Sequence, residues 1–115
     1  MSAINFFLER GHTPVVKNTS IYGADTIAVW TPLSDKRVMI TNVNLAAGAL
    51  DSTISFFFAD RQNPVAKIGT FGVPASLTIN LDIGCWESTA VGGVIYARKN
   101  TTLNEMTVNL TGFEV

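Results

Sequence analysis

Apolar and polar residues alternate in short runs along most of the chain, and clusters of Gly, Pro, Asn and Asp separate the runs. A period of two is typical of strands that bury one face, and no long stretch keeps the helical spacing of i, i+3, i+4 and i+7. Such strands, joined by turn residues, predict an all-β fold, an antiparallel sandwich or barrel. The predicted strands cover residues 26–31, 36–46, 52–59, 64–71, 76–82, 92–99 and 105–115.

The alternation changes phase inside the second of these runs. Val38 and Ile40 share one parity, whereas Val43 and Leu45 occupy the other. Because a strand has a period of two, one extra residue near positions 41–42 would turn all four side chains toward the core. The pattern therefore predicts a β-bulge there, and the alternative is a strand with both faces partly covered.

Three consecutive phenylalanines interrupt the alternation of residues 52–59. Phe56 and Phe58 share the parity of Ile54 and are expected to face the core, which leaves Phe57 on the other face. An exposed Phe on a sheet is a liability for a monomer. We therefore expect Phe57 to be covered by the N-terminal segment or to take part in a subunit contact.

Residues 1–25 differ in pattern from the predicted sandwich domain at residues 26–115. Their first part contains four large apolar residues, and the rest has weak periodicity and several turn residues. One interpretation is an edge strand followed by a long loop on the same core. The other is an arm that adds to a neighbouring subunit. On the second interpretation the candidate contact residues are Ile4, Phe6, Phe7 and Leu8.

The composition favours assembly with other chains. Hydrophobic residues make up 47% of the chain and charged residues 15%, against about 25% charged residues in an average soluble domain. So little charge leaves apolar surface that an assembly can bury. The formal net charge is −1 and the charges are scattered, which argues against a nucleic-acid partner. No apolar run has the length of a bilayer span, so no membrane partner is expected.

The residue types that carry chemistry are few and scattered. The single histidine, His12, lies in a predicted loop, and the single cysteine, Cys85, has acidic neighbours. With one His and one Cys, a zinc site would have to rely on scattered carboxylates. We therefore predict no enzyme, no metal and no cofactor. Trp86 offers a flat face for stacking on a sugar, which supports an alternative function in carbohydrate or receptor binding.

Asp35, Lys36 and Arg37 form the densest cluster of charge in the chain. Pro32 ends the preceding predicted strand and Ser34 adds a turn residue, so the triplet is interpreted as the polar end of a hairpin. Lys36 and Arg37 are then available to the carboxylates of a partner at the rim of an interface. Their expected role is contact rather than catalysis.

The layout of residues 26–115 resembles the small β-sandwich virion proteins of tailed bacteriophages, which include capsid decoration (cement) proteins. The resemblance rests on "WTPLSDKRVMITNVNL", a strand–turn–strand unit, "GGVIYA" and the close "LNEMTVNLTGFEV". It implies a jelly-roll-like sandwich of about seven to eight strands that binds the outer capsid surface in the virion. It also implies a homo-oligomer, with a trimer favoured, whose partner is the major capsid protein. The alternative is a carbohydrate- or receptor-binding module of a phage fibre or tail.

Overall fold

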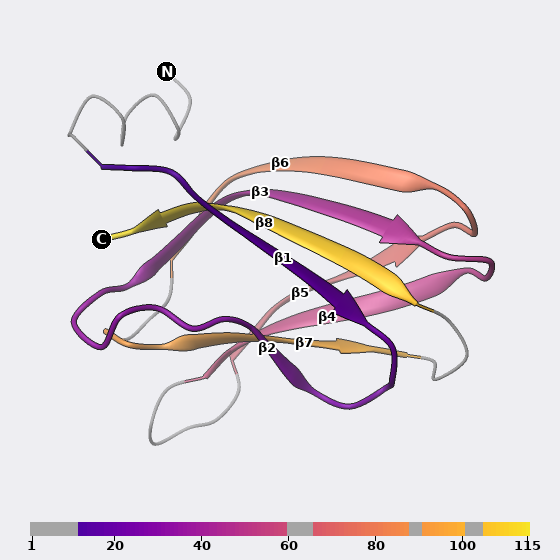
Figure 1. Cartoon of the computed structure of the whole chain (residues 1–115), viewed down its shortest axis with the longest axis horizontal. Coiled ribbons are helices and arrows are strands. Elements are labelled where there is room, and N and C mark those ends of the chain that lie inside the picture. Colours follow the sequence, from indigo (N-terminus) through magenta and orange to yellow (C-terminus); the bar gives the residue numbers. More distant parts are fainter. Residues whose placement is uncertain (1–11, 60–65, 88–90, 101–104) are drawn as a thin grey trace.

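Two antiparallel sheets of four strands each pack face to face in this chain (Figure 1). A computed structural model of the chain describes residues 12–59, 66–87, 91–100 and 105–115. The described residues form eight strands and no helix. The strands are β1 (Val15–Ile21), β2 (Ile27–Trp30), β3 (Val38–Ala47), β4 (Ser52–Ala59), β5 (Ala66–Val73), β6 (Thr78–Glu87), β7 (Val94–Lys99) and β8 (Met106–Glu114).

The order of the strands defines a jelly roll. One sheet, called sheet A here, has the order β1-β8-β3-β6, and the other, sheet B, has the order β2-β7-β4-β5. The chain crosses between the sheets at every connection except the one from β4 to β5, which are neighbours in sheet B. Eight antiparallel strands wound in this way form the double-sheet jelly roll. The predicted fold class is therefore confirmed, and all seven predicted strands are present.

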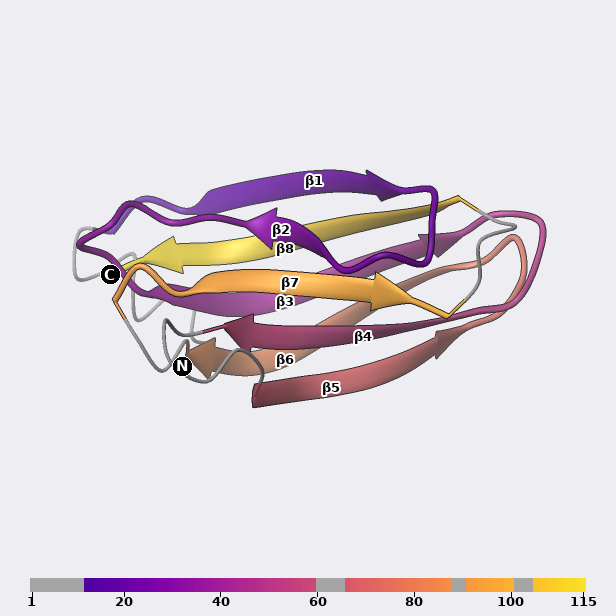
Figure 2. The same cartoon turned by 90° about the horizontal axis from the view of Figure 1, so that it is seen from below.

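The N-terminal segment contributes an eighth strand. β1 pairs with β8 over all of its seven residues and forms one edge of sheet A. Figure 2 places β1 along one margin of the sandwich, with β5 and β6 along the opposite margin. Val15–Ile21 therefore forms an edge strand on the same core, in a part of residues 1–25 where the sequence pattern predicted no strand. The proposed arm residues, Ile4, Phe6, Phe7 and Leu8, lie outside the described residues.

The core lies between the two sheets and is built from the alternating apolar positions of both. In sheet A, β8 contributes every second residue from Met106 to Leu110, all fully buried. In sheet B, Ile54 and Phe56 are fully buried, and Phe58 is partly buried against the same core, as their shared parity predicted. Burial of this apolar area is the main driving force for folding, at about 25 cal/mol per Å².

The predicted β-bulge is present in β3. The register between β3 and β8 shifts between Ile40 and Asn42, because Ile40 pairs with Gly112 and Asn42 pairs with Thr111. The extra residue, Thr41, is 2% exposed, and its hydroxyl donates a hydrogen bond of 3.1 Å to the carbonyl of Thr111. Apolar side chains on both sides of the bulge are fully buried, as the phase change predicted. These are Val38, Ile40, Val43 and Leu45.

Gly112 lies directly against this bulge. A Cβ atom added there would stand 1.8 Å from the carbonyl oxygen of Met39 and 3.0 Å from the Cα of Ile40. Both neighbours are backbone atoms of the central strand β3, so no side-chain rotation could make room. Only glycine permits this approach of β8 to β3.

Three aromatic rings close the margin of the sandwich at β5 and β6. Phe71 and Trp86 stack with ring centroids 5.7 Å apart, and Phe56 lies 6.1 and 6.5 Å from them. Phe71 comes from β5 in sheet B and Trp86 from β6 in sheet A, so the cluster joins the two sheets. One face of Trp86 is therefore occupied by packing inside the protein.

We expect Gly112→Ala to lower the free energy of unfolding by about 3 kcal/mol, because the new methyl group forces β8 away from the bulge. Urea denaturation followed by circular dichroism measures the change. Gly72→Ala is the matched control, since Gly72 lies in β5 with nothing within 4 Å of its added Cβ. It is expected to be neutral or slightly stabilising. Equal stability of the two variants would contradict the role given to Gly112.

Candidate functional site

The charged triplet lies in a tight turn, but the turn does not close a hairpin. The amide of Lys36 donates a hydrogen bond of 3.0 Å to the carbonyl of Leu33, which closes the turn over Ser34 and Asp35. The strands on either side, β2 and β3, lie in different sheets. The hairpin interpretation is therefore wrong: the turn carries the chain from sheet B to sheet A at one end of the sandwich.

Backbone hydrogen bonds hold this connection to the end of β8. Arg37 and Val115 exchange two backbone bonds of 2.8 and 2.9 Å, which extend the pairing of β3 with β8 beyond the strands. The Glu114 carboxylate accepts a hydrogen bond of 2.7 Å from the amide of Leu33. Both backbone groups of Leu33 are therefore hydrogen-bonded, its amide to Glu114 and its carbonyl to Lys36, and these bonds fix its position in the turn.

Gly92, which precedes β7, packs against the same turn. The amide of Gly92 donates a hydrogen bond of 2.6 Å to the carbonyl of Lys36. Gly92 has a φ of +76°, and a Cβ atom there would lie 3.1 Å from the carbonyl oxygen of Ser34. Glycine is therefore required for both its conformation and its close approach. The contact of Gly92 with Lys36 also places the preceding residue, Val91, next to the turn.

Two large apolar side chains protrude from this structure into solvent. Leu33 is 65% exposed and Val91 is 48% exposed. Arg37 follows in the chain and is also exposed, and its guanidinium lies 3.5 Å from the Glu87 carboxylate. Lys36 is half-buried. We call Leu33, Val91, Lys36 and Arg37 together the apolar tip. It combines exposed apolar surface with cations at the margin, which is the composition of a contact surface.

Phe57, the other predicted contact residue in the described part of the chain, lies on the outer face of sheet B. It is half-buried, with the guanidinium of Arg98 5.8 Å from its ring centroid. Arg98 comes from the neighbouring strand β7, where Tyr96 pairs directly with Phe57. The structure thus brings Lys36 and Arg37 together in one turn and places Phe57 on a separate surface, partly covered by a cation–π contact.

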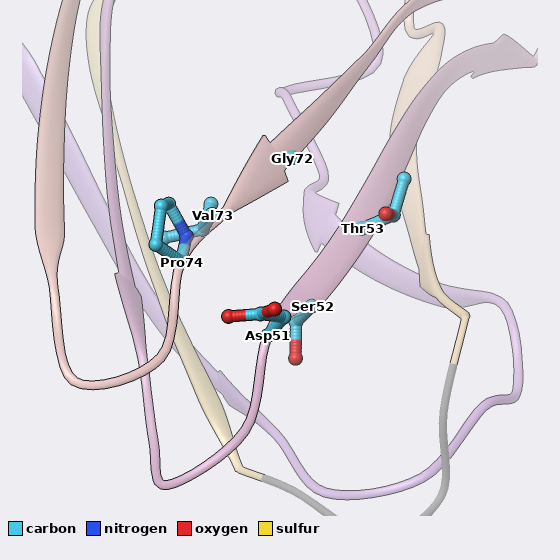
Figure 3. A pocket seen from close by; sticks show the side chains of 6 residues that line it. All are labelled: Asp51, Ser52, Thr53, Gly72, Val73 and Pro74. Carbon is cyan, nitrogen blue, oxygen red and sulfur yellow. The ribbon is translucent and has the colours of Figure 1, made fainter.

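An open pocket of about 340 Å³ lies where β4 begins and β5 ends (Figure 3). Asp51 supplies its one carboxylate, and one oxygen of that carboxylate accepts a hydrogen bond of 2.8 Å from the amide of Ala75. Asp51 therefore holds the β5–β6 connection in place, in the backbone-capping role that aspartates often take beside turns. The lining residues are Asp51, Ser52, Thr53, Gly72, Val73 and Pro74.

The remaining candidate groups are used in packing. His12 makes an edge-on contact with Phe113, with the ring centroids 6.4 Å apart. Trp30, the second tryptophan of the chain, is 1% exposed and belongs to the core. Among residues 12–59, 66–87, 91–100 and 105–115, no group of three or more His, Cys, Asp and Glu side chains could hold a metal ion. The same part of the chain forms no helix long and apolar enough to cross a membrane.

Sequence reasoning missed the buried cation Lys99 and the two residues that protrude from the tip. Lys99 is 1% exposed at the end of β7, and its amine donates a hydrogen bond of 3.2 Å to the carbonyl of Tyr22. Its inward parity with Ile95 and Ala97 was the signal that could have revealed it. Leu33 and Val91 lie in turns, where alternation gives no indication of orientation.

The comparisons with known proteins agree with the fold. No protein-family model matches the chain, and no curated protein matches it. The solved structure of PirA resembles it with a TM-score of 0.54 at 10% identity, over 84% of this chain and 92% of PirA. The capsid of cyanophage Pam1 is similar with a TM-score of 0.48 at 16% identity, over 89% of this chain and 85% of that one. The Tobacco streak virus coat protein gives 0.48 at 11% identity, with the same coverage of 89% and 85%. At this level of identity the likeness to PirA concerns the fold alone.

We expect Arg37→Ala to change the free energy of unfolding by less than about 1 kcal/mol, because the Arg37–Glu87 ion pair is exposed on both sides. Gly92→Ala should cost more, about 1–3 kcal/mol, since it strains the backbone that holds the tip. Chemical denaturation of both variants tests this order. A larger loss for Arg37→Ala would mean that Arg37 maintains the fold and is not free for a partner.

Burial lowers the pKa of the Lys99 amine below its usual value of 10.5. In the range between the lowered pKa and 10.5, the unfolded chain binds more protons than the folded one, so the contribution of Lys99 to stability increases with pH. We expect Lys99→Met to lose this increase. Denaturation of both proteins at several pH values up to 10.5 measures it. Parallel pH profiles for wild type and Lys99→Met would contradict the prediction.

Proposed function

We propose that this protein is a structural component of a virion, a capsid decoration protein that binds the outer surface of the shell as a homo-oligomer and stabilises it. The observation that carries the proposal is the apolar tip, with Leu33 and Val91 exposed on a backbone that is already fixed. The major capsid protein is the proposed partner at the tip.

The rigidity of the tip favours a contact function. Binding loses affinity when loops must be ordered at the interface, and a preformed surface avoids that cost. Leu33 is held by the turn bond from Lys36 and by the carboxylate of Glu114, and Val91 by its neighbour Gly92. Folding of the domain gains little from these side chains being apolar, because Leu33 is 65% and Val91 48% exposed.

The charges of the tip suit the rim of an interface. The guanidinium of Arg37 is 3.5 Å from Glu87, and both side chains are about half exposed, at 47% and 52%. Such a pair contributes little to folding and can exchange for a carboxylate of a partner. Rim charges of this kind guide orientation and association rate, while the apolar centre supplies affinity.

Clamping a shell needs little affinity from each copy. Each buried apolar contact contributes about 25 cal/mol per Å², and a multivalent oligomer multiplies the effect of a weak single contact. The sequence resemblance to capsid decoration proteins and the jelly-roll fold are consistent with this role. The low charge of the chain, 15% of its residues, also suits a protein that covers much of its surface in an assembly.

The test is co-sedimentation of the purified protein with heads of the virus that encodes the chain, both before and after shell expansion. Wild type is expected to sediment with at least one form. Leu33→Asp should weaken binding by at least about tenfold, because it places a charge at the centre of the contact. Absence of wild-type binding to both forms would overturn the proposed function.

Leu77→Asp is the matched control. Leu77 is 53% exposed in the β5–β6 connection, at the other end of the sandwich from the tip (Figure 1). This variant should bind like wild type. If Leu77→Asp loses binding while Leu33→Asp keeps it, the contact lies at the opposite end and the assignment to the tip is wrong. Both variants change exposed residues, so thermal unfolding should be close to that of wild type.

A further inference from the structure

The four sheet edges of the sandwich are not equivalent. β2, β5 and β6 each show a register shift against the neighbouring strand. β1 pairs with β8 over all seven residues of Val15–Ile21 without a shift. Irregular edges discourage pairing with other chains, whereas a long regular edge leaves a row of backbone donors and acceptors ready for another strand. β1 is thus the edge most suited to strand addition.

A row of asparagines crosses the outer face of sheet A and ends at this edge. The register aligns Asn18 with Asn109, Asn109 with Asn44, and Asn44 with Asn80, one from each strand of the sheet. The side-chain amide of Asn18 donates to Asn109, and that of Asn109 donates to Asn44 at 3.2 Å. Side-chain ladders of this type recur where strands stack with identical residues in register. Asn18, at the edge, is exposed.

We propose that two copies of this chain pair β1 against β1, antiparallel about a two-fold axis at Asn18, so that sheet A continues from one copy into the other. In this register Asn18 lies beside Asn18 of the second copy, and the two asparagine rows become one. Val16 faces Ser20 of the second copy on the outer side, and Lys17 faces Thr19 of the second copy on the inner side.

The register follows from the faces and charges of β1. The inward positions are Val15, Lys17, Thr19 and Ile21, with exposed residues between them. Shifting the second strand by one residue along the first would place inward side chains opposite outward ones. The core beneath each sheet forbids that arrangement. A centre at Lys17 would set two lysines directly opposite each other. The centre at Asn18 avoids both and pairs all seven residues.

Lys17 is the one residue of β1 that opposes pairing with a second strand. It is half-buried on the inward side of the edge strand, and a charge in such a position commonly restricts addition of further strands. In the proposed register Lys17 does not prevent pairing, because it faces Thr19 of the second copy. Its charge disfavours only the register centred on Lys17, in which two lysines would lie opposite each other. Lys17→Thr should therefore strengthen self-association, because it removes a charge from the interface and keeps a strand-forming residue.

The pairing gives the self-association within the proposed function a defined interface. A two-fold interface closes on itself and yields a dimer, which differs from the trimer that the resemblance implies. The interface concerns only copies of this chain, so it is tested on the isolated protein without shells. Its failure and the failure of shell binding are therefore observed in separate experiments.

Cysteine cross-linking tests the register directly, in a Cys85→Ala background. Residues opposite each other on paired strands have Cβ atoms roughly 4.5–5.5 Å apart, close enough for a disulfide after small adjustments. Asn18→Cys is expected to form a disulfide-linked dimer under mild oxidation. Val16→Cys alone and Ser20→Cys alone should not. In either variant the two equivalent cysteines of the dimer are separated by four residues along the strand, which is about 13 Å. A mixture of these two variants should form the mixed dimer. Equal cross-linking of all three single variants, or none, would overturn the proposal.

The mass in solution is the second measurement. Light scattering of wild type from micromolar to millimolar concentration should approach twice the chain mass of 12.4 kDa. The double variant Val16→Lys, Ser20→Lys places like charges opposite each other and should raise the dissociation constant at least tenfold. Asn80→Lys is the matched control on the β6 edge of the same sheet and should dimerise like wild type. A wild type that stays monomeric throughout, or that forms a trimer, would overturn the two-fold pairing.

Discussion

The contact between the bulge of β3 and Gly112 is the constraint on which the rest of the structure depends. Thr41 takes up one position of the strand, so apolar residues on both sides of it face the core. β3 lies between β8 and β6, and both neighbours shift register at the same point. The bulge can form only because Gly112 lets the backbones of β3 and β8 meet. Core packing and sheet register are therefore set by one local arrangement.

The bulge also determines how the apolar tip is held. Before it, Met39 faces away from the main core and packs with Phe113 in a second, smaller cluster that Val115 covers. This cluster fixes the last residues of β8 beside the start of β3, where Arg37 and Val115 exchange backbone hydrogen bonds. The Glu114 carboxylate is thereby placed where it accepts a hydrogen bond from the amide of Leu33. The rigidity of a surface turn thus comes from a small apolar cluster outside the main core.

The sequence predicted features that depend on local periodicity and missed those that depend on topology. The bulge near Thr41 could be predicted because the parity of apolar residues records which side chains reach the core. The hairpin at Asp35–Arg37 was predicted wrongly, since a period of two does not say which sheet a strand joins. β1 stayed ambiguous because two of its inward positions, Lys17 and Thr19, are polar. Exposure of Leu33 follows from contacts between distant segments, which no local pattern encodes.

The two margins of the sandwich are closed by different means, and this difference explains why their edges differ. At the β5–β6 margin, Phe71 and Trp86 stack across the sheets and complete an apolar core. At the β1 margin, the inward positions Lys17 and Thr19 supply no equivalent apolar contact. β1 gives the core only its two end positions, Val15 and Ile21, so its middle is held mainly by the ladder to β8. Its other side is a free sheet edge that offers backbone groups for a second ladder. The polar pair Lys17 and Thr19 on the inner face of β1 thus made the strand hard to recognise in the sequence, and it also leaves this margin open to a second copy.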